Sequence, residues 1–235
     1  MLINLAVVFL AFRKNWKMVS ITALIITWCL LLGSLAFEYS LALTGVAIGF
    51  SIAFYLLFVI DALLVTAFRK VRMSRADILQ VCFCNVLLYV AMLLAFPEPA
   101  VKVAVVTGSC LLYAVVMLFI VRYYLAAEKQ LLKLVSIQAL ALMVLYIIFQ
   151  WDGILVTFLW LAMAIALFIA GVRIKQSWLR VCAFPLVAMT LLKLVSVDVL
   201  KFSTGERILC FIVIGVLLLV GSFYYQRFNV GNKVK

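Results

Sequence analysis

The 235-residue sequence contains no histidine and has few acidic residues, with 8 aspartates and glutamates against 20 lysines and arginines. The missing histidine excludes haem ligation by histidine, histidine-based zinc sites and histidine-assisted nucleophiles. The sequence also lacks a nucleotide-binding loop, a glycine-rich phosphate cradle and paired carboxylates on one helix face. All 6 cysteines fall within apolar runs, where we expect structural packing. We therefore predict no catalytic residue, no metal site and no cofactor.

Charged residues are too scarce for a water-soluble protein of this size. They make up 12% of the chain, whereas 70% of the residues are hydrophobic, which leaves too few polar side chains to cover a soluble globule. The net charge of +12 would favour nucleic-acid binding in a soluble protein. Here the charges sit in short turns between apolar runs, where they meet anionic lipid headgroups. We therefore expect membrane lipids as partners and no nucleic acid.

What the sequence does contain is a series of eight long apolar runs. Each run is long enough, as a helix, to cross a hydrocarbon core of about 30 Å. The runs cover residues 18–37, 45–68, 76–96, 101–121, 131–150, 153–171, 179–200 and 207–225. They predict an all-α, polytopic integral membrane protein in which eight or nine transmembrane helices form successive hairpins. We expect residues 1–235 to form a single transmembrane domain.

The ninth segment is the short apolar run at residues 2–12. Its helical length of roughly 17 Å is too short to cross a bilayer unaided. The segment is therefore a thin span, a surface helix or the remnant of a longer chain. A cleavable signal peptide does not fit, because the charges follow the apolar run and no small-residue cleavage site comes after it.

Basic residues accumulate in alternate turns, and this asymmetry predicts the orientation. One set of turns holds 16 of the 20 basic residues: Arg13, Lys14, Lys17, Arg69, Lys70, Arg72, Arg75, Arg122, Lys129, Lys133, Arg173, Lys175, Arg180, Arg227, Lys233 and Lys235. Of the carboxylates, only Asp77 and Glu128 lie in these turns. By the positive-inside rule these turns and the C-terminus are cytoplasmic. We expect the protein in a bacterial inner (cytoplasmic) membrane.

Asp61 is the deepest ionisable residue in any predicted span. It precedes Phe68 by seven residues, which places it about 10 Å inside the cytoplasmic end of its helix. Ionisable groups at this depth are candidate functional sites, because burying them in hydrocarbon is costly. Asp61 can bind a proton or a cation there. Alternatively, it faces a neighbouring helix, where it caps a hydroxyl or meets a basic residue of the inner turns.

A second candidate site lies at the outer end of the 179–200 run. It is a polar cluster formed by Lys193, Asp198, Lys201, Glu206 and Arg207. Opposite charges at helical spacing can neutralise each other, so we favour a structural clamp over a site for an anionic headgroup or a sugar.

Earlier in the same run, Pro185 removes a backbone hydrogen bond and should kink the helix. Such a kink is a feature of mobile gates and of static bent helices alike.

The last third of the chain resembles a known family. The resemblance rests on residues 160–171 and on matching positions further on: Arg173, Arg180, Lys193, Asp198, Arg207, Phe211, Gly215, Phe223, Tyr224, Tyr225, Gln226 and Arg227. These residues resemble the C-terminal region of the bacterial predicted multi-pass membrane proteins catalogued as domain of unknown function twenty-three thirty-nine. Members of that family are usually longer, so the resemblance implies either a short member or a terminal fragment. It implies that Lys193, Asp198 and Arg207 are family features, and it implies no activity.

Three classes of function remain. The first hypothesis is transport or the handling of lipids or envelope components, with the outer cluster and the kinked helix lining a cavity. The second is a non-catalytic scaffold or subunit that packs against a membrane-protein partner or forms a homo-oligomer. An intramembrane enzyme is the third hypothesis. It comes last because the sequence shows no recognisable nucleophile and base. A cavity lined by Asp61 or Lys193 would favour the first, and mutually satisfied charges would favour the second.

Overall fold

A computed structural model describes most of the chain. The described residues are 2–14, 16–37, 44–69, 72–96, 99–125, 128–174 and 176–194, together with the single positions 196, 205, 208, 212, 215 and 219. Eight α-helices are defined in these ranges. The chain divides into two compact units, Met1–Gln150 and Trp151–Lys235, each with its own internal packing. The expectation of a single transmembrane domain over residues 1–235 stays a prediction.

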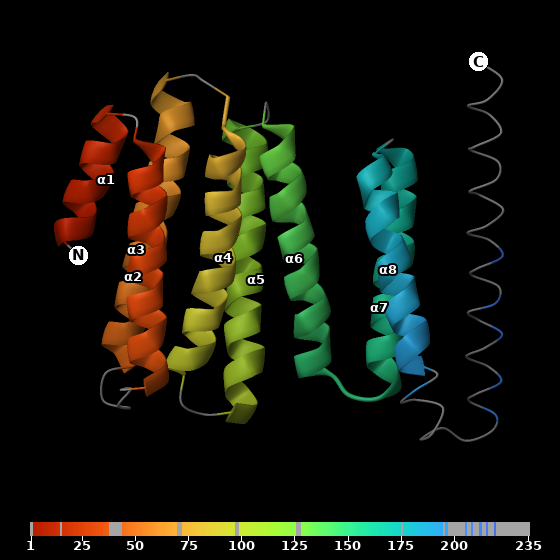
Figure 1. Cartoon of the computed structure of the whole chain (residues 1–235). Helices are drawn as coiled ribbons and strands as arrows, with labels where there is room; N and C mark the ends of the chain where they lie inside the picture. Colours follow the sequence, from red (N-terminus) through yellow and green to blue (C-terminus); the bar gives the residue numbers. More distant parts are fainter. Residues whose placement is uncertain are drawn as a thin grey trace, which may run out of the picture. The chain divides into compact units, whose positions relative to one another are not determined.

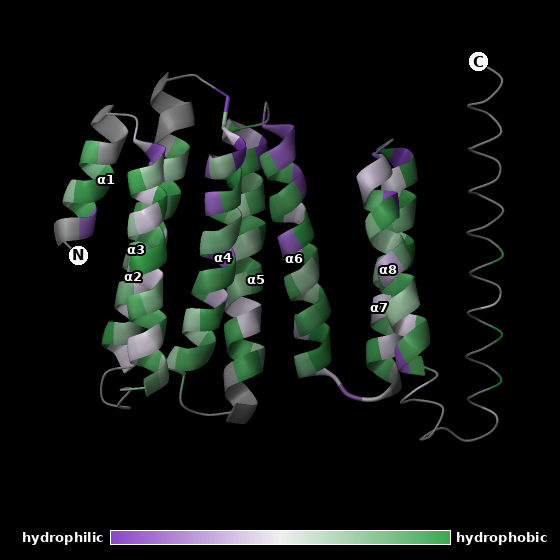
Figure 2. Ribbon diagram, viewed as in Figure 1, coloured by the Kyte–Doolittle hydropathy of each residue, from purple (hydrophilic) through white to green (hydrophobic). Residues whose placement is uncertain are grey.

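Unit 1 consists of six helices in which successive helices run in opposite directions (Figure 1). Their bounds are α1 (Leu2–Lys14), α2 (Lys17–Phe37), α3 (Thr44–Arg69), α4 (Arg75–Ala95), α5 (Pro99–Tyr124) and α6 (Lys129–Gln150). The first residues of α2, α4 and α6 lie at the same end as the last residues of α1, α3 and α5. We call this the basic end of unit 1. Figure 2 shows hydrophilic residues gathered there. The first three cation-rich turns thus lie together, as successive hairpins predict.

Helix α4 is the centre of unit 1. It contacts α2, α3, α5 and α6. Half of the residues in its apolar span are buried, against 28% of those in α2, 33% in α3 and 28% in α5. Trp28, Tyr55, Phe58 and Cys84 are fully buried against this helix or within it. The outward faces of the helices remain apolar (Figure 2), which suits contact with lipid.

Local sequence explains where two of these helices begin. Ser74 and Asp77 form a capping box at the start of α4, because the Ser74 hydroxyl accepts a hydrogen bond from the Asp77 amide at 3.3 Å and the Asp77 carboxylate accepts one from the Ser74 amide at 3.0 Å. Helix α5 begins at Pro99, a position where the missing N–H of proline costs nothing.

Unit 2 contains an antiparallel pair of helices, α7 (Ile154–Arg173) and α8 (Ser177–Lys193) (Figure 1). Gly153 precedes α7 with φ of 64° and ψ of −135°, a conformation open almost only to glycine. Gly171 of α7 lies close to the beginning of α8. A Cβ atom built there would lie 2.7 Å from Arg180 Cγ and 3.0 Å from the Arg180 backbone nitrogen. Both glycines are therefore required by the backbone path of this hairpin.

Six of the described helices, α2 to α7, are long and apolar enough to span a membrane. The chain is thus an all-helical, multi-pass membrane protein, whereas the count of eight or nine spans stays a prediction. Helix α1 has 13 residues, in keeping with the short run at 2–12. Helix α8 has 17 residues and ends at Lys193, earlier than the predicted run 179–200. The predicted run 207–225 lies outside the described residues apart from positions 208, 212, 215 and 219.

Candidate functional site

The polar residues of α4 connect it to each helix that packs around it. Asp77, Gln80, Asn85 and Tyr89 follow one another along α4 and bond to residues of α2, α3, α5 and α6. By helical rise they span about 18 Å, which is more than half of a hydrocarbon core of about 30 Å. The candidate site of unit 1 is this column of polar groups.

At the basic end, an ion pair joins α2 to α4. Lys17 Nζ lies 2.6 Å from Asp77 Oδ2 and donates a second hydrogen bond of 2.9 Å to the Ser74 hydroxyl. Asp77 is buried, whereas the Lys17 side chain is partly exposed. Within the described ranges this is the only ion pair. This ion pair involves Asp77, one of the two carboxylates of the cation-rich turns.

The other carboxylate of the cation-rich turns, Glu128, joins the turn before α4 to the start of α6. The backbone amide of Met73 donates a hydrogen bond of 3.0 Å to Glu128 Oε1, and both residues are buried. The acidic residues of these cation-rich turns therefore connect helix ends to one another.

Asp61 lies one helical turn deeper than the ion pair. Its carboxylate accepts a hydrogen bond of 2.5 Å from the Ser20 hydroxyl of α2 and one of 3.4 Å from the Gln80 side-chain amide of α4. Only 7% of Asp61 is exposed. Gln80 also donates to the Phe58 carbonyl at 3.0 Å. The structure thus places Asp61 against a hydroxyl of a neighbouring helix. This is one of the two alternatives that the sequence left open, the other being the binding of a proton or a cation.

A second, partly buried network lies further along α4 and joins four helices. Asn85 accepts a hydrogen bond from the Tyr55 hydroxyl at 2.9 Å and donates to the Gln138 side chain at 2.8 Å. Gln138 in turn donates to the Cys82 carbonyl at 2.7 Å. The Tyr55 and Tyr113 hydroxyls are hydrogen-bonded, and their rings meet edge to face.

A cavity of about 20 Å³ adjoins this network, lined by Asn85, Tyr113 and Gln138 among apolar side chains. A buried water needs at least about 10 to 15 Å³ and two to four polar partners. The cavity therefore has room for about one water molecule.

Near the far end of the column, the hydroxyls of Tyr89 and Thr107 lie 3.1 Å apart. This contact joins α4 to α5 beyond the level of the Asn85 network. Thr107 also donates to the Val103 carbonyl of its own helix at 2.5 Å. This contact between the column and α5 involves no charged group.

Candidate sites in the sequence were sought among ionisable residues, so the uncharged part of the column was not predicted. The signal was available: Gln80, Asn85 and Gln138 are amide side chains inside apolar runs. Amides in membrane helices commonly bond across helix interfaces. The partner of each amide, however, is not visible in the sequence.

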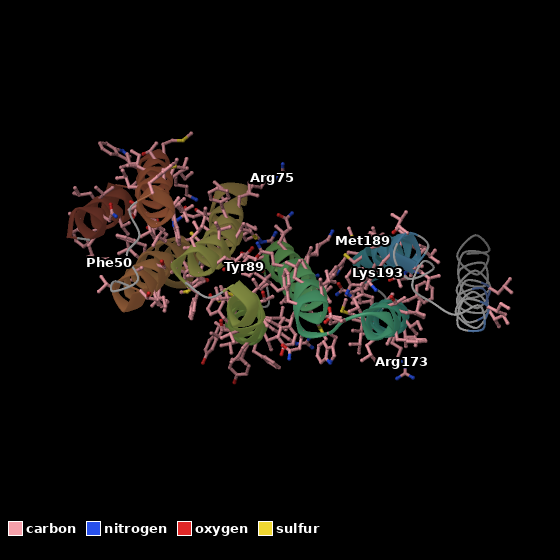
Figure 3. The ribbon with its side chains drawn as sticks, turned by 90° about the horizontal axis from the view of Figure 1, so that it is seen from below. Phe50, Arg75, Tyr89, Arg173, Met189 and Lys193 are labelled. Carbon is pink, nitrogen blue, oxygen red and sulfur yellow. The ribbon has the colours of Figure 1, made fainter. Side chains whose placement is uncertain are left out.

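In unit 2, Lys193 of α8 reaches across to the beginning of α7 (Figure 3). Its ammonium group donates hydrogen bonds of 3.0 Å to the Gly153 carbonyl and 2.9 Å to the Thr157 hydroxyl. Thr157 is buried. Lys193 therefore ties together the ends of α7 and α8 that lie opposite their connecting turn.

The other members of the predicted outer cluster, Asp198, Lys201, Glu206 and Arg207, lie outside the described residues. Pro185 lies within α8, which continues through it from Ser177 to Lys193. The kink at Pro185 stays a prediction. Among the described residues, no group of three or more cysteine or acidic side chains is arranged to hold a metal ion.

Comparison with protein families gives one match. Residues 148–228 match the family model described as predicted membrane protein (DUF2339). The match covers α7, α8 and the positions beyond them, and it confirms the resemblance noted for the C-terminal region of the sequence. Neither the curated proteins nor the solved structures contain a match to the chain.

Proposed function

We propose that the chain is a non-catalytic membrane protein that serves as a structural subunit of a membrane complex. The proposal is supported by the hydrogen bonds that the polar groups of the interior make to neighbouring helices and turns. Asp61, Asp77 and Glu128 each bond to a neighbouring helix or turn, and so does Lys193 in unit 2. Polar groups that satisfy one another in this way fix how helices are paired.

The energetics agree with a structural role. Interhelical hydrogen bonds in membranes contribute only about 0.6 kcal/mol each on average, because the separated helices also find partners. A single contact would therefore stabilise little. Several contacts along one helix instead specify which faces of α2, α3, α5 and α6 meet α4, since any rotation would leave polar groups in hydrocarbon.

The small cavity in the described part of unit 1 fits the same proposal. The cavity beside Asn85 and Gln138 has room for about one water molecule, and its remaining lining is apolar. This cavity is too small for a sugar or a lipid headgroup.

Transport or lipid handling is the second candidate, and one observation favours it. Asp61 lies within electrostatic reach of both Lys17 and Asp77. Lys17 pairs with Asp77 and not with Asp61, so a proton or a cation can instead neutralise the Asp61 carboxylate. In this function Asp61 would be the coupling residue.

Proton flux into liposomes separates the two candidates. The purified chain, its Asp61→Asn variant and no protein are compared in liposomes that hold a pH-sensitive dye and an imposed pH gradient. For a structural subunit we expect equal decay of the gradient in all three. Faster decay with the unchanged chain, returned to the protein-free rate by Asp61→Asn, would establish coupled transport and overturn our proposal.

A second experiment tests the subunit directly. Mild solubilisation of native membranes, followed by native electrophoresis and cross-linking mass spectrometry, should place the chain with a second membrane protein at fixed stoichiometry. Asp61→Leu, which disturbs the column, should reduce this association, whereas Asp61→Asn should retain it. Migration as an isolated chain under the mildest conditions would contradict the proposal.

A further inference from the structure

Four exposed cations surround one hydrogen bond at the basic end of unit 1. Met73 donates to Glu128, and this bond holds the turn before α4 beside the start of α6. Arg72 precedes Met73, and Lys129 follows Glu128. Arg75 and Lys133 lie within one helical turn of these positions. All four side chains are exposed.

The acidic residues nearby do not balance these cations. Asp77 is paired with Lys17, and Glu128 receives the Met73 amide. In the part of the chain that the structure describes, no ion pair involves Arg72, Arg75, Lys129 or Lys133. This corner therefore carries four positive charges against the single carboxylate of Glu128.

Directly below Arg75, the outward face of α4 is a continuous apolar stripe. Its members follow helical spacing and are exposed to between 36% and 62%: Leu79, Phe83, Val86, Val90 and Leu94. Figure 3 shows Arg75 pointing outward from unit 1. Arg75 and Val86 are about 16 Å apart along the helix, which is roughly the depth of one leaflet's hydrocarbon.

Exposed tyrosines mark the same level of the membrane. Tyr123 and Tyr124 end α5, which packs against α6, and they are 82% and 76% exposed. Tyrosine is enriched at the headgroup level of bilayers because it combines an apolar ring with a polar hydroxyl. The cations of this corner therefore stand at headgroup level, above a surface suited to acyl chains.

We propose that this corner binds an anionic phospholipid of the bilayer. The phosphate-bearing headgroup lies among Arg72, Arg75, Lys129 and Lys133, and one acyl chain follows Leu79, Phe83 and Val86 along α4. Arginine suits this role because its planar guanidinium group donates two parallel hydrogen bonds to a phosphate. Membrane lipids are also abundant at the place where these side chains lie.

Native mass spectrometry of the purified, delipidated full chain tests this site. Phosphatidylglycerol and phosphatidylcholine are titrated separately, and their dissociation constants are compared. A cation near an anionic membrane surface contributes about 1 kcal/mol, which corresponds to about fivefold in affinity. We expect phosphatidylglycerol to bind more tightly, Arg75→Gln to weaken it about fivefold, and Arg75→Gln with Lys129→Gln about 25-fold.

Arg173→Gln is the matched control, because Arg173 is also an exposed arginine at a helix end. It should leave phosphatidylglycerol binding unchanged, and Arg75→Lys should retain most of it. Thermal unfolding of each variant verifies folding. Equal affinity for the two lipids, or equal weakening by Arg75→Gln and Arg173→Gln, would overturn the proposal. Displacement of phosphatidylglycerol by millimolar inorganic phosphate would instead assign the corner to a soluble anion.

Discussion

The Ser20 hydroxyl of α2 donates a hydrogen bond of 2.5 Å to the Asp61 carboxylate of α3, and both residues are buried. The two positions are 41 residues apart in sequence. One turn nearer the basic end, Lys17 and Asp77 make the corresponding contact between α2 and α4. Three helices are thus joined by two successive polar contacts.

The first prediction concerns this contact between α2 and α3. Asp61→Leu removes the acceptor of Ser20 and of Gln80, so we expect the free energy of unfolding to fall by about 1 to 2 kcal/mol. Asp61→Asn keeps an acceptor oxygen and should cost less. Unfolding in mixed micelles with increasing sodium dodecyl sulfate measures both variants.

A double-mutant cycle with Ser20→Ala is the control for Asp61→Leu. If the two side chains interact as described, the double variant should lose less stability than the two single variants together. Strictly additive losses would show that the Ser20 contact contributes nothing of its own.

The second prediction concerns the close approach of α7 and α8. Gly171→Ala would place a methyl group 2.7 Å from Arg180 Cγ and 3.0 Å from a backbone nitrogen. Because the backbone cannot move aside easily, we expect a loss of roughly 1 to 3 kcal/mol in the same unfolding assay. Gly33→Ala is the matched control, since no described atom lies within 4 Å of a Cβ built there. A loss no larger than that of Gly33→Ala would contradict the tight packing.

The third prediction concerns the network at Asn85. Asn85→Leu removes the acceptor of the Tyr55 hydroxyl and the donor to the Gln138 side-chain oxygen, and should destabilise unit 1 by about 1 to 3 kcal/mol. Asn85→Leu combined with Gln138→Leu removes both amides, so the double variant should be less destabilised than the sum of the single variants. A double variant destabilised by the full sum of the single losses would show that the two amides act independently.

The fourth prediction concerns Lys193 and the beginning of α7. Lys193→Met keeps the length of the side chain but removes its hydrogen bonds to the Gly153 carbonyl and the Thr157 hydroxyl. We expect faster hydrogen exchange of the backbone amides at the start of α7, measured in nanodiscs by mass spectrometry. Thr157→Val, which removes one of the two acceptors, should give a smaller increase. Unchanged exchange in Lys193→Met would contradict a clamp.

The fifth prediction is the orientation in the membrane. In a cysteine-free variant, Arg72→Cys should be labelled by a membrane-impermeant maleimide only after the cells are opened, because the turn is predicted to be cytoplasmic. Asp152→Cys, in an alternate turn, should be labelled in intact cells. The reverse pattern would invert the predicted topology.

Several features followed from the amino-acid sequence alone. The scarcity of charge and the length of the apolar runs determine a multi-pass helical membrane protein, because a hydrogen-bonded helix is the backbone structure that such runs adopt in lipid. The same runs give the approximate bounds of α2 to α7. The C-terminal residue pattern was also sufficient to predict the family match over residues 148–228.

Only the tertiary structure decided which helix faces meet. In water, an apolar stripe on an otherwise polar helix reveals the buried side, but these helices are apolar all round, so neither periodicity nor composition fixes their rotation. The pairing of Asp61 with Ser20, of Asn85 with Gln138, and of Lys193 with Thr157 joins residues on different helices. Such contacts depend on how helices pack in three dimensions, and the sequence names the polar groups without naming their partners.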